Sequence, residues 1–191
     1  DVLGSRGLGD VYKRQVLKKK YYHLIILVRN QMGLKNLYKI VSEAHVNYFF
    51  KKPRVPRSLL NKYRDGLILT SACEAGELYR AIVEGRSYEE LKKIASYYDI
   101  LEVQPLGNNA YMVREGKVES EEVIKDFNRT VIQLGEDLHK PVIATGDVHF
   151  TEPEDAIYRS VLQAGNGFKD ADNQPPLFYL SLIHISEPTR P

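Results

Sequence analysis

Short apolar runs alternate along the chain with longer segments of helical periodicity. Runs rich in Ile, Leu and Val predict buried strands at residues 23–28, 67–71, 100–104 and 141–145. Between and after them, apolar positions spaced three or four residues apart predict helices at 33–49, 74–84, 120–139 and 154–164. The chain therefore reads as repeated strand–helix units.

Local signals place the shorter elements. Gly85 is expected to close the helix before it, and Ser87 with Glu90 has the pattern of a capping box that opens another helix. Residues 58–63 predict a short helix. Two loops are expected, one at 51–57, which holds two prolines, and a loop or small hairpin at 105–116.

Strands separated by helices predict an α/β protein built from parallel βα units. Such units either close into a barrel or spread as an open sheet. Four strands are too few for a closed barrel. The sequence thus predicts a small open sheet or part of a larger structure.

The composition is that of a soluble globular protein. The chain has 191 residues, of which 43% are hydrophobic and 27% are charged. Its longest clean apolar run, Leu24 to Val28, is far shorter than the roughly 20 residues that cross a bilayer, so no membrane association is expected. A single cysteine excludes an internal disulfide and predicts a reducing, cytoplasmic location.

The formal net charge of +2 hides an uneven distribution. Residues 16–60 hold ten Lys or Arg and one acidic residue, whereas residues 61–180 hold 13 basic and 21 acidic residues. Four of the cations, Lys51, Lys52, Arg54 and Arg57, share the proline-stiffened loop and are candidates for phosphate contact. The alternatives are a solvated surface loop and a contact with an acidic neighbouring domain.

The two ends fit the alternating pattern poorly. Residues 1–15 and 181–191 contain peptides that look like translated sequencing-adaptor sequence. We expect both segments to be non-native tails, which leaves residues 16–180 as the native part. Ordinary flexible termini are the alternative.

The strongest chemical signal follows the fourth predicted strand. Asp147 and His149 lie two residues apart, so in an extended segment their side chains point to the same side. One carboxylate and one imidazole on the same side commonly hold a divalent metal, and loops at the carboxyl ends of parallel strands form the functional face. The alternative is a turn in which Asp147 caps the next segment.

Cys73 follows the second predicted strand at the equivalent position. A thiolate is a good ligand for zinc, but a free cysteine is more often a small buried apolar residue. The next acids, Glu74 and Glu77, are expected in the first turn of the following helix. His23 opens the first strand, and Glu102 within the third strand needs a partner if it is buried.

Five segments jointly match a known family. They are QMGLKNLYKIVS (31–42), PRVPRS (53–58), SACEAGE (71–77), TGDVHF (145–150) and GFKDADNQPP (167–176). Together these segments resemble the PolC-type DNA polymerase III alpha subunits, the replicative polymerases of low-GC Gram-positive bacteria, in the C-terminal part of their polymerase-and-histidinol-phosphatase (PHP) domain.

The resemblance implies a fold and a metal site. The fold is a distorted β7α7, TIM-like barrel with a multinuclear divalent metal site, of Zn, Mn or Fe, at one mouth. The family's Asp-x-His pair falls on Asp147 and His149, its cysteine ligand on Cys73 and one histidine ligand on His23. Its early His-x-His motif, its Asp-His and its Glu ligand have no counterpart here, so no catalytic residue is assigned.

The resemblance also implies partners and activity. DNA synthesis and 3′–5′ proofreading belong to the parent polymerase, whose Mg site is absent here. The implied partners are DNA, the remaining polymerase domains (exonuclease, palm and the rest of the PHP domain) and replisome subunits. This fragment is expected to catalyse nothing alone. A stand-alone PHP phosphoesterase, which the absence of His-x-His disfavours, and a non-catalytic module that contacts DNA or another domain are the alternatives.

Overall fold

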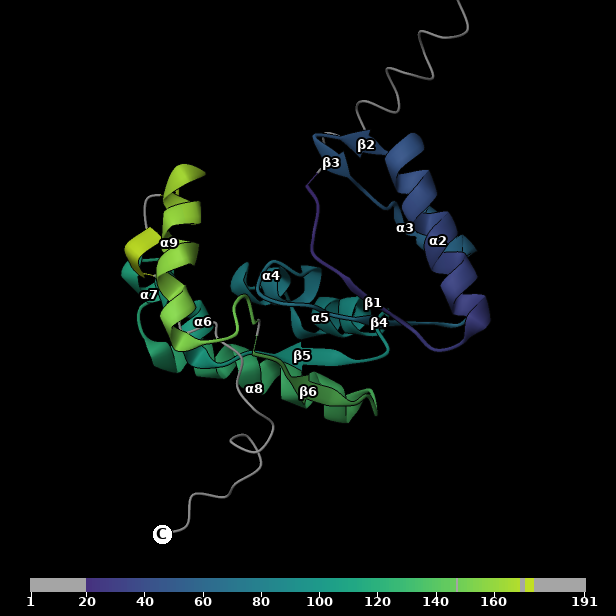
Figure 1. The fold of residues 1–191 in the computed structure, drawn as a ribbon. Coiled ribbons are helices and arrows are strands. Elements are labelled where there is room, and N and C mark those ends of the chain that lie inside the picture. The colour runs from purple at the N-terminus through teal and green to yellow at the C-terminus, as the bar shows by residue number, and fades with distance from the viewer. Residues whose placement is uncertain (1–19, 147, 169–170, 174–191) are drawn as a thin grey trace, which may run out of the picture. The chain divides into compact units, whose positions relative to one another are not determined.

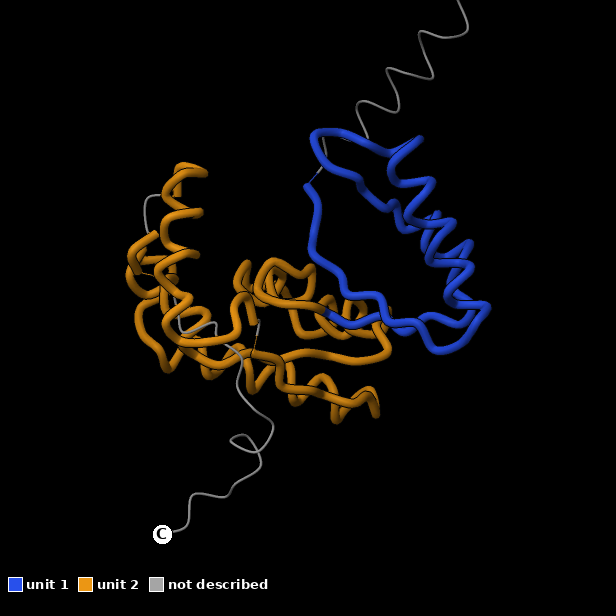
Figure 2. Tube along the Cα trace, viewed as in Figure 1, with its two compact units in different colours: residues 1–71 blue, residues 72–191 orange. Residues whose placement is uncertain are grey.

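The computed structural model describes residues 20–146, 148–168 and 171–173. The chain forms two compact units that meet between Ser71 and Ala72 in sequence (Figure 2). Each unit has its own strand pairing and its own buried residues, and we describe each by itself.

Within residues 20–71, the first unit contains two helices and two antiparallel strand pairs (Figure 1). Its elements are β1 (Ile25–Val28), α2 (Gln31–Val46), β2 (Phe49–Phe50), β3 (Lys52–Pro53), α3 (Arg57–Lys62) and β4 (Leu67–Thr70). β2 and β3 form a hairpin that turns at Lys51, whose φ of 61° lies in the left-handed region. The expected loop at 51–57 therefore holds half of a hairpin and the start of α3.

β1 pairs with β4 in antiparallel orientation, so the prediction of parallel units is wrong for this pair. The reason lies in the contacts just before β4. The amide of Arg29 donates to the carbonyl of Gly66 at 2.9 Å, and the side chain of Asn36 donates to the Asp65 carbonyl at 2.9 Å. The chain thus enters β4 beside the end of β1, and β4 must run back along it.

Helix α2 begins at Gln31, two residues before the predicted start, because the side chain of Asn30 caps it by accepting from the amide of Gly33 at 2.9 Å. The buried apolar residues of this unit come from α2, α3 and β4. They are Ile40, Ala44, Leu59, Leu60, Leu67 and Leu69.

The second unit combines six α-helices and two short 3-10 helices with one parallel strand pair among its described residues. Its elements are α4 (Glu77–Val83), α5 (Tyr88–Ala95), β5 (Leu101–Val103), α6 (Leu106–Asn109), α7 (Tyr111–Arg114), α8 (Glu121–Asp137), β6 (Val142–Ala144), η1 (Pro153–Asp155), α9 (Ala156–Gly165) and η2 (Ala171–Asn173). Leu101 pairs with Val142 and Val103 with Ala144, so β5–α8–β6 is the expected parallel crossover.

The helix boundaries of this unit follow the local signals with two corrections. Ser87 and Glu90 form the predicted capping box, and Gly85 closes α4 with a φ of 69°. Helix α4 begins only at Glu77, because residues 73–76 form a turn in which the Gly76 amide donates to the Cys73 carbonyl at 2.8 Å. The expected loop at 105–116 contains the one-turn helices α6 and α7.

Helix α8 forms the centre of the second unit, since it contacts α4, α5, α6 and both strands. The ring of Phe127 on α8 meets Tyr79 of α4 edge to face at a centroid distance of 5.9 Å. The apolar side chains that are at most 5% exposed here include Leu78, Leu91, Ala95, Leu101, Ile124, Val131 and Leu134. No helix among the described residues is long and apolar enough to cross a membrane.

Candidate metal centre

Polar groups gather where β5 and β6 end. Glu102 of β5 is only 4% exposed, and Thr145 Oγ1, just past β6, donates to its Oε2 at 3.0 Å. The Thr145 amide donates to the Val103 carbonyl at 3.0 Å, and the Asn108 side chain donates to the Gly146 carbonyl at 3.1 Å. These bonds hold the start of the Thr145–His149 segment beside the carboxyl end of β5.

We expect Thr145→Val to lower the free energy of unfolding by about 1–3 kcal/mol. Valine has nearly the same size as threonine but lacks the hydroxyl, so the buried carboxyl oxygen of Glu102 loses this hydrogen-bond donor. Thr130→Val is the matched control. Its hydroxyl donates to the Asp126 carbonyl on an exposed face of α8, so the change there should stay near zero. Urea unfolding followed by circular dichroism measures both, and equal effects at the two positions would contradict the role of Thr145.

Of the Asp147–His149 pair, the structure describes only one residue. Asp147 lies outside the described residues, whereas His149 is described and exposed. The prediction that the two side chains share one side therefore stays a prediction. Gly146, before the pair, accepts the hydrogen bond from Asn108 through its carbonyl.

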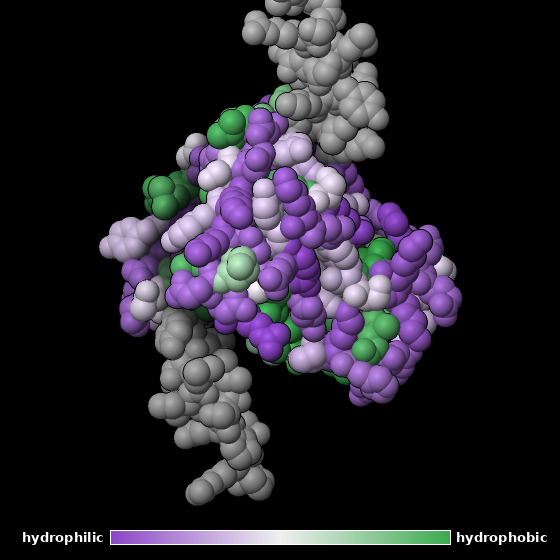
Figure 3. Space-filling view, turned by 90° about the vertical axis from the view of Figure 1, so that its right-hand side faces the viewer, coloured by the Kyte–Doolittle hydropathy of each residue, from purple (hydrophilic) through white to green (hydrophobic). Residues whose placement is uncertain are grey.

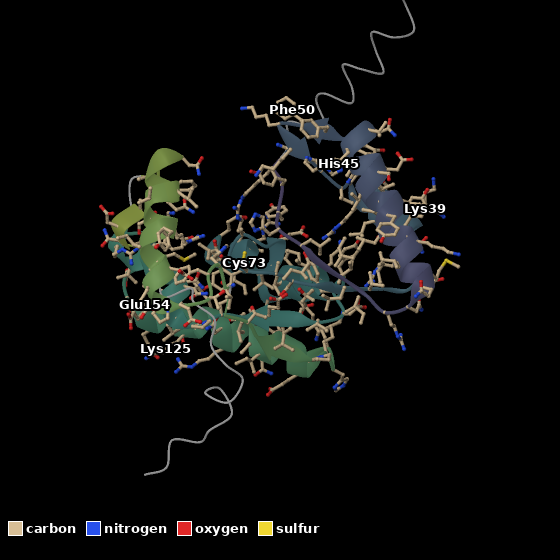
Figure 4. The ribbon with its side chains drawn as sticks, viewed as in Figure 1. Lys39, His45, Phe50, Cys73, Lys125 and Glu154 are labelled. Atoms are coloured by element: carbon tan, nitrogen blue, oxygen red, sulfur yellow. The ribbon has the colours of Figure 1, made fainter. Side chains whose placement is uncertain are left out.

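Cys73 occupies the turn that precedes α4, and its side chain is half-exposed (Figure 4). Its neighbour Ala72 has a φ of 58°, in the left-handed region that favours glycine. Non-glycine residues in this region carry strain of about 1–3 kcal/mol and are frequent at functional sites. Glu77 lies in the first turn of α4 as expected, but Glu74 lies in the turn with Cys73, so its predicted helical position is wrong.

Two tyrosines lie near Glu74 of this turn, Tyr79 buried and Tyr111 half-buried. Burial, followed by the negative charges of Glu74 and Glu115 and a smaller effect of Cys73, raises the pKa of Tyr111 to about 12. Burial, with Tyr111 and Glu74, also raises the pKa of Tyr79, whose hydroxyl accepts from Asn109 at 3.2 Å. Both phenols therefore stay neutral at physiological pH. This pair of tyrosines could not be recognised from the sequence, because aromatic residues in helices are typical of a core.

Uncharged oxygen atoms lie buried in the same unit. The side-chain oxygens of Gln104, Asn109 and Asn128 have no hydrogen-bond partner among the described residues. Gln104 follows β5 directly, and its own carbonyl accepts from the Asn128 side chain at 3.0 Å. The thiol of Cys73 and the imidazole of His149 are donor types that suit Zn²⁺ and other divalent transition metals.

The candidate ligands do not form a complete cluster in the described structure. In the described ranges, no three His, Cys, Asp or Glu side chains are grouped so that they could hold a metal ion. His23 is exposed, lies two residues before β1 and belongs to the first unit, whereas Cys73 and His149 belong to the second.

Three of the four cations of the basic segment lie in or beside the β2–β3 hairpin. Lys51 forms its turn, Lys52 lies in β3 and Arg54 follows β3, whereas Arg57 begins α3. All are exposed except Arg54, which is half-buried.

The profile of the PHP domain family matches residues 9–104, about half of the chain. The chain belongs to the PHP domain family. The matched range includes His23, the basic hairpin and Cys73, and it ends directly after β5. Asp147 and His149 lie beyond it.

Relatives of the chain carry the name PolC-type DNA polymerase III. The chain is 49% identical over 181 residues to such a protein from Clostridium perfringens, an alignment that covers 94% of this chain and 12% of that relative. It is 49% identical over 164 residues to one from Caldanaerobacter subterraneus, with 86% of this chain and 12% of the relative covered. For one from Bacillus subtilis the values are 43% over 163 residues, 85% and 11%. The chain therefore spans about an eighth of the length of these relatives.

Proposed function

We propose that the chain is the C-terminal portion of the PHP domain of a PolC-type DNA polymerase III. The observation that carries this proposal is the similarity over 94% of the chain to a relative of which it covers only 12%. DNA-directed DNA synthesis and 3′–5′ proofreading are then properties of the parent protein, with DNA, the remaining polymerase domains and replisome subunits as its partners and the cytoplasm as its location.

In this proposal, the parallel β5–α8–β6 crossover is one section of a distorted β7α7 barrel. Its parallel register and the packing of α8 on both strands support this, because barrels of this class repeat such units. The strand ends at Val103 and Ala144 would then belong to the mouth of the barrel.

The proposed metal site uses Cys73, Asp147, His149 and His23 as ligands for Zn, Mn or Fe. The thiolate and imidazole donors, and the oxygen acceptors near the end of β5, fit such an ion. When bound, the metal would polarise a phosphoester and lower the pKa of a bound water. In this chain, the Thr145–Glu102 hydrogen bond would hold the segment that carries Asp147 and His149.

Metal content tests this site. We expect the purified chain to bind substoichiometric or weakly held metal, and His149→Ala and Asp147→Ala each to lower the metal retained after dialysis by about tenfold or more. His45→Ala is the matched control, because His45 is also an exposed imidazole, on α2, bonded to the Val41 carbonyl at 2.8 Å. Elemental analysis that finds no Zn, Mn or Fe, or an equal loss in the His45 variant, would remove the site.

The genomic locus tests the assignment to a polymerase. An open reading frame with exonuclease motifs before this segment and a polymerase palm after it is the expected result. A short gene with a His-x-His motif near its start would instead establish a stand-alone phosphoesterase. The same reasoning predicts no metal-dependent phosphatase or nuclease turnover by the 191-residue chain, and turnover abolished by Asp147→Ala would contradict this.

A further inference from the structure

The β2–β3 hairpin presents aromatic rings among cations. The Arg54 guanidinium lies 4.5 Å from the ring centre of Tyr21 and 5.5 Å from that of Phe50. The ammonium of Lys52 lies 4.6 Å from the Tyr21 ring. Figure 4 shows Phe50 at the hairpin, which follows the end of α2. We call Tyr21, Phe49, Phe50, Lys51, Lys52 and Arg54 the hairpin surface.

Part of the hairpin surface is open to solvent. Phe49 is 54% exposed and Tyr21 is 42% exposed, so large ring areas face water. Lys51 and Lys52 are exposed as well. The left-handed φ of Lys51 tightens the turn, and Phe50 pairs with Lys52 across it, so these two residues share one side of the hairpin. An exposed phenylalanine ring beside ammonium groups offers a flat apolar surface and positive charge to the same ligand.

The charge around the hairpin surface selects for an anionic occupant. Residues 20–71 hold ten Lys or Arg and only two acidic residues, whereas residues 72–173 hold 11 basic and 20 acidic residues. The face of the molecule in Figure 3 is dominated by hydrophilic residues, with apolar residues in small separate groups. A strongly basic region with exposed aromatic rings fits a polyanion that also carries flat groups.

We propose that the hairpin surface binds single-stranded DNA, with a base stacked on the exposed ring of Phe49 and phosphates contacted by Lys51 and Lys52. Base stacking on aromatic side chains together with a basic surface is how proteins hold single strands without sequence preference. Arg54 has a positioning role, because a guanidinium that lies over Tyr21 and Phe50 orders both rings.

A single strand suits these residues better than a duplex or an acidic protein. A duplex hides its base faces in the stack, so exposed rings would add nothing to its binding. An acidic protein offers carboxylates for the lysines but no flat partner for the exposed ring of Phe49. The inference deepens the proposed function, because it names the part of the chain that touches DNA, and it involves none of the proposed metal ligands.

Fluorescence anisotropy with the 191-residue chain and a labelled oligothymidylate of roughly 20 nucleotides tests the proposal. Phe49→Ala should weaken binding about tenfold, as expected for one lost stacking contact. Lys51→Gln with Lys52→Gln should make the slope of log affinity against log salt shallower by about 1.4, because each phosphate contact on a single strand contributes about 0.7. Glutamine keeps the side-chain length and leaves the backbone strain at residue 51 unchanged.

Lys92→Gln with Lys93→Gln is the matched control, since it removes two adjacent lysines from α5 in the acidic second unit. Its affinity and salt slope should equal those of the unchanged chain. Equal affinity for the oligothymidylate and for a duplex of the same length, or no effect of Phe49→Ala, would overturn the proposal. Polyglutamate that competes as well as the oligonucleotide would assign the surface to an acidic protein instead.

Discussion

Gly33→Ala should lower the free energy of unfolding of the first unit by about 3 kcal/mol, at the upper end of what overpacking costs. A Cβ at Gly33 would overlap the carbonyl oxygen and the carbonyl carbon of Gly66. Both are backbone atoms, so no side-chain rotation can relieve the overlap. Gly66 itself has a φ of 72° and lies against the side chain of Asn30. The substitution therefore pushes apart the start of α2 and the chain that enters β4.

Hydrogen–deuterium exchange measures this locally. Amides of β1, α2 and β4 should exchange roughly a hundredfold faster in the Gly33→Ala chain, while those of α8 keep their wild-type rates. Gly165→Ala is the control, because Gly165 lies in α9 with no atom within 4 Å of an added Cβ, and alanine should leave stability equal or slightly higher. Unchanged exchange in β4 would show that the two backbones separate at little cost.

The same glycine pair shows why strand direction could not be read from the sequence. The strands themselves were predictable, since β1, β4, β5 and β6 all lie within the expected apolar runs. Whether β1 and β4 run parallel depends on where the chain re-enters the sheet, and that is fixed by Gly33 against Gly66 and by Arg29 bonded to Gly66. Such contacts between distant residues leave no periodic trace in the sequence.

Turns limited the prediction in a similar way. The capping box at Ser87 and the cap at Gly85 were predictable, because each is a local motif with its own residue types. The β2–β3 hairpin was missed because its turn residue is Lys51, with a positive φ at a position where Gly or Asn would have signalled it. The turn at Cys73 was missed because Ala72 takes up the same unusual conformation.

The candidate site was predictable only where a reactive side chain had a distinctive neighbourhood in sequence. Cys73 and His149 were identified as strand-end residues, but the phenols of Tyr79 and Tyr111 with their raised pKa were not. Tyr79 of α4 and Tyr111 of α7 both lie near Glu74, and such proximity between separate elements cannot be read from the spacing of residues. Glu102 was recognised as an acid that needs a partner, and the structure supplies Thr145 among its contacts.

Lys140→Met should lower the free energy of unfolding of the second unit by about 2–3 kcal/mol. The half-buried ammonium of Lys140 donates to three carbonyls at the end of α5, those of Ala95 at 3.3 Å, Ser96 at 2.7 Å and Tyr98. Carbonyls at a helix C-terminus lack partners within the helix, and a cation there also complements the helix dipole. Methionine keeps most of the aliphatic length but leaves these acceptors without their charged donor.

The position of Lys140 makes this effect larger than that of a surface lysine. Its amide donates to the Gly135 carbonyl at 2.8 Å, and the next carbonyl, of Pro141, accepts from Leu101 at 2.9 Å. The lysine thus joins the end of α8, the end of α5 and the start of the parallel strand pair. Urea unfolding followed by circular dichroism measures the effect. In that measurement Lys125→Met, which removes a lysine paired with Glu122 at 3.0 Å on the surface, should lower the free energy of unfolding by about 0.5 kcal/mol or less. An equal loss of stability for the two variants would mean that water satisfies the three carbonyls as well as Lys140 does.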